Sequence, residues 1–437
     1  MIDAAQMRKG WCPGARRPMR AKDGLLVRLK ISCATLSAKT LRGIAQAGQR
    51  YGNGQFDLTS RASLQIRGVR EDKLPLLIKV LDRFGLIDRN AAAEAVRNVL
   101  VSPLAGLDGR YDALAAARAL EATLAANTDL YALPAKFGFL VDEGNVLSLA
   151  DVPADIRFDW EGGEKPFLVA IGGTFKDAIA LGRCEAKNIP RIATSIARAF
   201  VRLAAQMPEP PRRMRGLIEN CGADAIAAVS GLRVHTQQRL GIIEEFSPIG
   251  LLRHHEKYHF GAGAPFGHLD AQMLDAAAYG AELFGTGEIR LTPWRALIFP
   301  NVQNLQTQSM PDYFAARGFV VARKDARLAV AACGGSVTCE RGTTDTRSDA
   351  LALMFAARRL CRTGVALQFL GCGKGCGHQE RTPLTLIANA GLYDLAADET
   401  FFGQGITNAN QLTLGSARDK LEALARNAGR PRKLDWP

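Results

Sequence analysis

The sequence lacks several features that would place it in particular classes of protein. Its 437 residues contain no uncharged apolar run of roughly 18 residues, so no membrane span is expected. The opening MIDAAQMRKGWCPG has no apolar core of the kind found in signal or transit peptides. Aromatic residues make up only 7%, and no basic motif with interleaved aromatics is present. We therefore expect a cytoplasmic protein whose partners include neither membrane nor nucleic acid.

Basic side chains outnumber acidic ones. The 56 Lys and Arg against 43 Asp and Glu give a formal net charge of +13. A small polycarboxylate bound in a cleft would use this positive field. The chain is long enough for roughly two to four packed units. Its nine cysteines, an odd number, fit a reducing cytoplasm better than a disulfide framework. Five of the nine have no close partner in the sequence and by default are core or inert thiols: Cys12, Cys33, Cys184, Cys221 and Cys361.

Four cysteines near the C-terminus form two pairs. Cys333 and Cys339 are spaced C-x5-C in AACGGSVTC, and Cys372 and Cys376 are spaced C-x3-C in GCGKGC. Such loops suit a compact [4Fe–4S] cluster, because each iron needs one thiolate and glycines allow the backbone to approach closely. Two alternatives stay open. One is structural zinc, whose pairs usually enclose about two to four residues. The other is four buried cysteines without a metal.

The segment between the cysteine pairs predicts one helix and one strand. TTDTRSDALALMFAARRLCRTG favours a helix capped by Thr344 or Asp345, with Gly364 just past its end. VALQFLGC favours a short buried strand that leads into Cys372.

The sequence also contains an internal repeat. A shift of 233 residues aligns 36–69 with 269–302 without a gap, and 10 of the 34 positions are identical. Each copy predicts a helix followed by strands, GQFDLTSRASLQIRGV in the first and GEIRLTPWRALIFPNV in the second. Similarity at so long a spacing favours duplicated domains packed about a pseudo-twofold axis. Chance stays an alternative, because two amphipathic helix–strand units share patterning in any case.

Two further kinds of segment complete the chain. The first has an alanine-rich helix near 110–126, a hairpin in LPAKFGFLVDEGNVLSLADV turning at Glu143 and Gly144, and a long helix over 187–206 that ends at MPEPPRRMR. The second carries the four cysteines and a β-rich end. We therefore expect a doubled α+β protein with four domains, at 1–85, 90–206, 215–325 and 326–437.

With these motifs in hand, the chain resembles the nitrite and sulfite reductase family over nearly its whole length. The resemblance rests on ACGGSVTC, GCGKGC, LTSRASLQIRG, RNVLVSPLAG and LPAKFGF. It implies two ferredoxin-like half-domains and two α/β domains of the cluster or tetrapyrrole-binding type. It also implies a [4Fe–4S] cluster, with a tetrapyrrole held at the junction of the domains.

Family members use the tetrapyrrole in two ways. In the reductases it is a sirohaem cofactor, and in an oxygen-using branch of cobalamin synthesis it is the substrate. KGWCPGARRPM, PWRAL and GCGKGCGH make the chain most similar to that branch. The resemblance then implies oxygenation by O2 and lactone closure on an acidic tetrapyrrole, a mononuclear non-haem iron, and an external donor, NADH or a redox protein. We expect a monomer. The alternatives are a sirohaem reductase and a non-catalytic iron–sulfur electron carrier.

The resemblance also assigns three catalytic candidates, Arg61, Arg97 and Lys136. Arg61 matches the strand arginine that faces the tetrapyrrole, Arg97 the arginine of an RN motif, and Lys136 the first lysine of K-F-K. The third position of that motif is Gly138 here. Reduction of sulfite or nitrite needs dense positive charge, so the missing lysine argues against it and fits a site for neutral O2. Cys376 matches the cysteine that bridges the cluster to sirohaem iron in the reductases.

A binding floor for carboxylates is suggested by the residues themselves. Side chains at alternate positions from Thr59 to Arg67 share one face of a predicted strand, and an arginine fork pairs with a carboxylate through two hydrogen bonds. A solvated strand face and a solvated N-terminal arm are the simpler interpretations. The substrate-binding candidates are Arg16, Arg17, Thr59, Gln65, Arg67 and Asn98.

Two motifs in one segment imitate other proteins. HEKYH at 255–259 matches a zinc-protease motif, but the repeat places it on a strand, where its histidines would lie roughly 13 Å apart. GAGAPFG imitates a dinucleotide loop, but it contains Pro265 and lacks a βαβ context. We keep His254, His255, Glu256 and His259 as candidates for an iron site. His378 is either close to the cluster or part of an ordinary loop.

Overall fold

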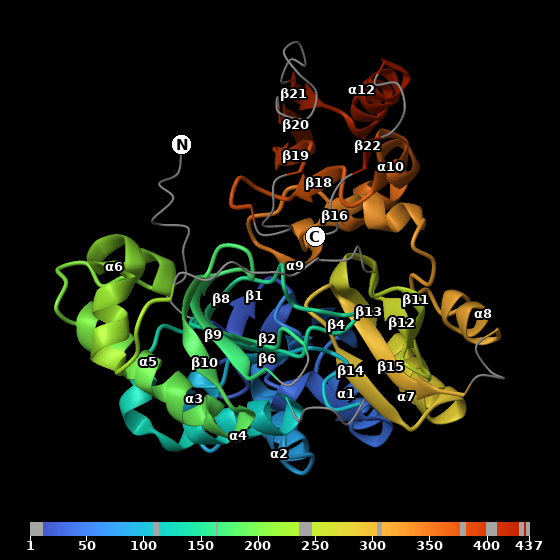
Figure 1. Ribbon diagram of the computed structural model, residues 1–437. Coiled ribbons are helices and arrows are strands. Elements are labelled where there is room, and N and C mark those ends of the chain that lie inside the picture. Colours follow the sequence, from blue (N-terminus) through green and yellow to red (C-terminus); the bar gives the residue numbers. More distant parts are fainter. Residues whose placement is uncertain are drawn as a thin grey trace.

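The computed structural model describes residues 12–107, 113–162, 165–235, 247–303, 308–375, 382–398, 409–427 and 432–433. This part of the chain contains four five-stranded sheets, each covered by helices, and one two-stranded sheet. The C-terminal unit stands above the other three (Figure 1). The predicted α+β class with a duplicated two-domain architecture is therefore confirmed.

Two of the sheets are built from the internal repeat, and each has one strand from the other copy. The first has the order β1 (Met19–Ala21), β2 (Gly24–Leu29), β5 (Leu64–Val69), β4 (Gln55–Leu58) and β13 (His268–Asp270). The second has the order β11 (Gly250–His254), β12 (Lys257–Gly263), β15 (Ala296–Val302), β14 (Glu288–Leu291) and β3 (Thr35–Ser37). Thus β3 pairs with β14, and β13 pairs with β4.

The two copies correspond element by element at the spacing found in the sequence. Helix α1 (Ala38–Tyr51) and helix α7 (Ala271–Phe284) begin and end 233 residues apart, and so do β3 and β13, and β4 and β14. Left-handed backbone recurs as well, at Ala62 (φ 50°) and Arg295 (φ 59°). The two helices pack together beneath the sheets (Figure 1). A reciprocal exchange of edge strands is what a pseudo-twofold relation between the copies produces.

The other two sheets also share one topology. The first runs β6 (Val99–Val101), β7 (Phe139–Asp142), β8 (Ala154–Asp159), β9 (Phe167–Gly173) and β10 (Ile179–Cys184), with two parallel pairings followed by two antiparallel ones. The second runs β16 (Val330–Ala332), β18 (Leu367–Leu370), β19 (Leu384–Asn389), β20 (Leu392–Ala397) and β21 (Ala409–Leu412), with the same pairings. The duplication therefore includes both kinds of unit.

Helices cover these sheets with their apolar faces. In the cysteine-bearing unit, α10 (Thr346–Leu360) is capped by Asp345, whose side chain accepts from Ser348 N at 3.4 Å. This is one of the two predicted caps. The remaining elements are α2 (Leu74–Asp82), α3 (Ala91–Val96), α4 (Ala113–Ala126), α5 (Ile189–Ala204), α6 (Met214–Ser230), α8 (Met310–Ala315), α9 (Gly335–Thr338), α12 (Leu414–Asn427), β17 (Cys361–Thr363) and β22 (Arg432–Lys433).

Two local expectations differ from the structure. The segment at 133–152 is not a hairpin, because β7 pairs in parallel with β6 and β8, and the chain after it turns where Asp142 accepts from Gly144 N and Leu149 N. Helix α6 packs on α5 and β9, so 214–230 joins the unit predicted at 90–206. The other domain limits stay predictions. No helix in the described residues is long and apolar enough to cross a membrane.

Candidate active site

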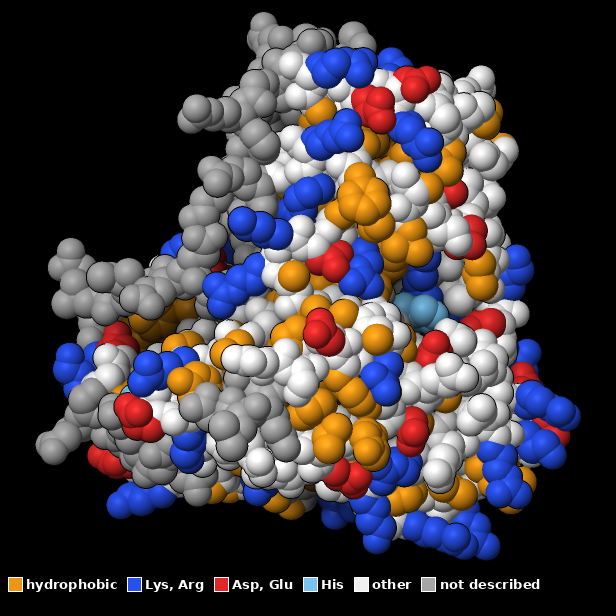
Figure 2. Space-filling view, turned by 90° about the vertical axis from the view of Figure 1, so that its right-hand side faces the viewer, with side chains coloured by type: hydrophobic (Ala, Val, Ile, Leu, Met, Phe, Trp, Pro, Cys, Tyr) orange, Lys and Arg blue, Asp and Glu red, His pale blue; other side chains and the backbone are white. Residues whose placement is uncertain are grey.

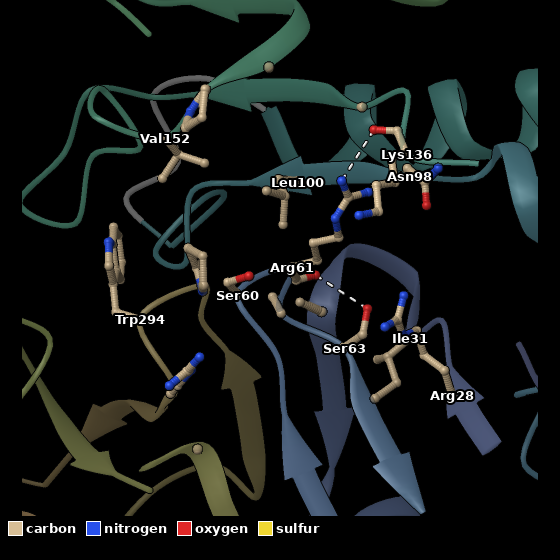
Figure 3. Close-up of a pocket in the computed structure, with 18 of the residues that line it drawn as sticks. Arg28, Ile31, Ser60, Arg61, Ser63, Asn98, Leu100, Lys136, Val152 and Trp294 are labelled. Atoms are coloured by element: carbon tan, nitrogen blue, oxygen red, sulfur yellow. Dashed lines mark hydrogen bonds between the residues drawn. The ribbon is translucent and has the colours of Figure 1, made fainter. Parts of the chain in front are cut away.

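A cavity of about 580 Å³ lies where the four units meet. The first repeat contributes residues around Arg61, the second repeat contributes residues around Trp294, and the other two units contribute Lys136 and Ala331. Figure 3 shows Trp294 and Val152 on one side and Arg61, Asn98 and Lys136 on the other. The lining has two acidic side chains, Glu121 and Asp151. It has eight basic ones, which are Arg28, Lys30, Arg61, Arg97, Lys136, Arg213, Arg295 and Arg327.

Arg61 is held by a tight turn between β4 and β5. Thr59 Oγ1 accepts from Arg61 N at 3.2 Å and from Ser63 N at 3.3 Å, and Ala62 has a left-handed backbone. Arg61 Nη2 donates to Lys136 O at 3.2 Å (Figure 3). Burial, with smaller effects of nearby arginines, lowers the pKa of Arg61. Among the described residues no carboxylate forms an ion pair with Arg61, so its guanidinium can pair with an anionic ligand.

Arg28 and Lys30 were not predicted as site residues. With the Gln65 amide oxygen turned toward it, Arg28 donates to that oxygen from Nε at 2.9 Å and from Nη2 at 2.7 Å. Lys30 Nζ donates to Asn98 Oδ1 at 2.6 Å and to Ala95 O at 3.0 Å. Burial lowers the pKa of Lys30 to about 7. Their alternation, with Arg28 near the end of β2 and Lys30 just after it, was the sequence signal that could have found them.

Arg97, a predicted catalytic residue, lines the cavity but already has two acidic partners. Its Nη2 lies 2.9 Å from Asp88 Oδ2, and its Nη1 lies 3.4 Å from Glu121 Oε1. Burial acts to lower the pKa of Arg97, but these carboxylates outweigh it and raise the pKa. Burial raises the pKa of Glu121 itself. Arg97 therefore ties the wall together and carries little free charge. Asn98 similarly donates to Ala95, Ala135 and Phe137 carbonyls.

Several predicted substrate-binding residues do not line the cavity. Arg67 is buried and pairs with Asp23 and Asp57 at 2.8 Å each, so its fork is occupied by protein carboxylates. Thr59 shapes the turn below Arg61, and Gln65 orients Arg28. Arg16 and Arg17 are exposed on the N-terminal segment and do not line the cavity.

The cysteine loops lie against one another through their glycines. Cys333 follows β16 directly, and its Sγ accepts from Gly371 N at 3.1 Å. A Cβ on Gly342 would lie 2.3 Å from Gly335 C, so the backbones touch where side chains would normally stand. Cys339 and Cys372 are also described, and Cys376 and His378 lie outside the described residues. In the described ranges, no three His, Cys, Asp or Glu side chains form a ready metal site. Thiols with a backbone N–H donor in a glycine cradle nevertheless fit an iron–sulfur cluster.

The histidine-rich segment forms a hairpin. His254 ends β11 and Lys257 begins β12, with His255 at the turn (φ 52°). As expected, the segment is not a helix. Because it folds back as a hairpin and is not one continuous strand, the ring centroids of His254 and His259 are only 6.4 Å apart. His259 is fully buried, and burial lowers its pKa to about 4. The described residues give these side chains no complete metal-binding group.

The fold and the cavity define a class of protein with two exchanged ferredoxin-like halves and a basic cavity at their junction. The family model of the nitrite/sulfite reductase ferredoxin-like half domain matches residues 17–84 and 252–311, which carry the two exchanged sheets. In these two segments the chain is similar to the nitrite and sulfite reductase family.

Individual relatives include proteins with two different activities. The precorrin-3B synthase of a Sinorhizobium species is 26% identical over 437 aligned residues, which cover 97% of this chain and 90% of that protein. The chloroplastic ferredoxin–nitrite reductase of Arabidopsis thaliana is 25% identical over 86% of this chain and 69% of its own. The NirA protein of Mycobacterium tuberculosis has a similar fold, with a TM-score of 0.71 at 18% identity, covering 93% of this chain and 81% of that one.

Proposed function

We propose that this protein is a precorrin-3B synthase, which oxygenates precorrin-3A and closes a lactone in cobalamin biosynthesis. The observation that supports this most is the cavity at the four-unit junction, with eight basic and two acidic side chains. Its volume of about 580 Å³ suits a small-molecule site. An acidic tetrapyrrole combines a large apolar ring system with many carboxylates, and these are the two features that such a cavity can recognise.

We assign residue roles by whether each basic side chain already forms an ion pair with a carboxylate of the protein. Arg61 and Arg28 present guanidinium groups with no acidic ion-pair partner among the described residues, and Lys136 lies beside Arg61. We assign carboxylate binding to these three. Arg97 positions the wall through Asp88 and Glu121. Basic side chains are also spread over the outer surface (Figure 2), so the positive field extends beyond the cavity and would attract a polyanionic substrate.

The reaction needs electrons as well as oxygen. One atom of O2 enters the product and the other leaves as water, which consumes two electrons and two protons. Cys333, Cys339, Cys372 and Cys376 would hold a [4Fe–4S] cluster, which supplies electrons when bound. Ala331 lines the cavity two residues before Cys333, so the cysteine loop adjoins the substrate site. The donor would be an external redox protein or NADH. We assign no residues to a mononuclear iron.

A sirohaem-dependent nitrite or sulfite reductase is the second candidate, because several relatives are ferredoxin–nitrite reductases. Gly138 separates the two proposals. It lines the cavity, and a Cβ there would meet only Lys136 O at 3.9 Å. A Cβ thus has room at this position, but this chain lacks the lysine that the reductases carry.

The deciding experiment is to purify the protein without oxygen and to measure its absorption spectrum, iron, sulfide and extractable tetrapyrrole. About four irons and four sulfides per chain, with no sirohaem bands, would support the synthase and lead to an assay of precorrin-3A with O2. One sirohaem per chain would favour the reductase. Protein without iron would contradict both proposals.

A further inference from the structure

The same type of turn lines the cavity twice, once between β4 and β5 of the first repeat and once between β14 and β15 of the second. In the first copy, Thr59 N donates to Ser63 O at 3.0 Å and Ala62 N donates to Thr59 O at 3.0 Å. In the second, Thr292 N donates to Ala296 O at 3.1 Å and Arg295 N donates to Thr292 O at 3.3 Å. The tips of both turns, Ser60–Ser63 and Pro293–Arg295, line the cavity. Two related backbones therefore face one ligand from opposite sides.

The side chains on the two turns differ in chemistry. Arg61 corresponds to Trp294 at the repeat spacing of 233, and the cationic strand positions Arg28 and Lys30 correspond to Gly261 and Gly263. Those glycines leave no room for a cation, because a Cβ would lie 1.7 Å from Pro248 O at Gly261 and 2.8 Å from Ile249 Cδ1 at Gly263. Of the repeat residues that line the cavity, the first copy thus contributes three cations, Arg28, Lys30 and Arg61, whereas the second contributes an indole and one cation, Arg295.

The indole of Trp294 is held in place from behind. It packs against the buried clusters around Leu104 and Leu140, and Leu100 and Val152 pack against the second of these as well. The side chain is half-buried, and it stands at the side of the cavity opposite Lys136 (Figure 3). Phe266, on the segment that corresponds to 32–34, also lines the cavity. A rigid aromatic surface of this kind offers contact area with little loss of side-chain entropy.

We infer that Trp294 determines how the substrate is oriented, by stacking on the apolar ring system so that a carboxylate-bearing edge faces Arg61 and Arg28. The inference rests on the proposed function and assigns one wall of its site to ring contact and the other to charge. A pseudo-twofold cavity with identical walls would accept a ligand in two orientations. Arg295 is the one cation that the second repeat adds to the described lining, and an indole stands where the first wall has Arg61. The second orientation is therefore disfavoured, because it would turn more of the ligand's carboxylates toward an aromatic ring.

Uroporphyrin III, a stable polycarboxylate porphyrin, is the probe for a test by absorbance titration of the full chain. We expect Trp294→Ala to weaken binding by about 10- to 100-fold, which is the range for loss of one aromatic stack. Trp294→Phe should stay within about threefold of the unmodified protein. The loss in Trp294→Ala should persist at high salt, whereas the loss in Arg61→Leu should shrink as salt rises, because only the latter removes a charge contact.

Three outcomes separate this inference from the proposed function. If the unmodified protein binds uroporphyrin and Arg61→Leu weakens it, but Trp294→Ala binds equally well, the role of Trp294 is refuted and the substrate class stands. If the unmodified protein binds no porphyrin, both fail. If Trp294→Ala weakens binding at low and high salt and Trp294→Phe binds nearly as well as the unmodified protein, the inference is supported, with equal thermal midpoints of the variants excluding a folding defect.

Discussion

Replacement of Arg67 by methionine should destabilise the protein strongly, although the residue lies outside the cavity. Arg67 bridges Asp23 and Asp57 at 2.8 Å each, and the three side chains are 7%, 11% and 16% exposed. Removing one partner of a buried ion pair costs about 3–5 kcal/mol, because the remaining charge stays buried. Asp57 keeps Arg347 at 2.8 Å and His268 at 3.1 Å. We therefore expect the lower end, a loss of about 3 kcal/mol in the free energy of unfolding.

The loss should also depend on pH in a defined direction. Burial acts to raise the pKa of Asp57, but His268, Arg347 and Arg67 outweigh it and hold the pKa well below its usual range. A carboxylate with a lowered pKa stabilises the folded state above its unfolded pKa of about 4, and this stabilisation is lost as the pH falls. Arg67→Met should therefore differ most from the unmodified protein near pH 7, and the difference should narrow below about pH 4.

Urea unfolding followed by circular dichroism measures this effect, and Arg70→Met is the matched control. Arg70 makes a similar two-bond contact with Asp72, at 3.1 and 3.0 Å, but the side chains are 72% and 54% exposed. An exposed pair contributes little to stability, so this control should unfold at nearly the same urea concentration as the unmodified protein. Equal midpoint shifts for the two variants, or a shift in Arg67→Met that does not change with pH, would refute the reasoning.

Three further predictions concern the cysteine loops, a buried histidine and the cavity. Gly342→Ala should lower iron and sulfide per purified chain, because its Cβ would lie 2.3 Å from Gly335 C, whereas Gly373→Ala has nothing within 4 Å and should bind both normally. The pKa of His259 is lowered to about 4 by burial, so stability is complete above the unfolded value of about 6.5 and falls by roughly 3 kcal/mol as the pH drops toward 4. A His259→Gln protein should lack that slope in urea titrations. Gly138→Lys should fold with an unchanged thermal midpoint, since a Cβ has room at this position. It should bind nitrite more tightly in difference spectra, because the side chain adds a cation. Equal nitrite affinity would argue that Gly138 does not set the cavity's preference between an anion and a neutral ligand.

Local patterns in the sequence were sufficient for much of the fold. The repeat at 233 residues and the cap at Asp345 are confirmed because both depend on short-range order, namely a helix–strand unit and a helix start. The exchange of β3 and β13 between the sheets was not predictable, since both edge strands are three residues long and pair across about half the chain. The attachment of α6 (Met214–Ser230) to β9 (Phe167–Gly173) is also non-local, although over a shorter distance in sequence, and no local pattern predicted it.

The predicted site shows a similar division. Lys136 and Arg61 both line the cavity, and the family motif supplied both. What no strand pattern could show is which arginines already have partners. Arg67 and Arg61 share a strand face in the sequence, yet Asp23, 44 residues before Arg67, occupies the Arg67 fork. Whether an arginine can bind a ligand's carboxylate depends on such non-local ion pairs, so it can be judged only from the folded structure.

The first repeat has two groups of cations, one that lines the cavity and one that contacts the cysteine loop. Arg67 Nη2 donates to Thr338 O at 3.2 Å and Lys22 Nζ donates to Ser336 O at 2.7 Å, so both reach the loop between Cys333 and Cys339. The position that corresponds to Arg67 in the second repeat is Pro300, which has no donor. The copy that supplies more cations to the cavity is thus also the one whose Arg67 and Lys22 hold the cysteine loop. One duplicated frame, made unequal by its side chains, can in this way hold a ligand in one orientation and keep the cysteine loop beside it.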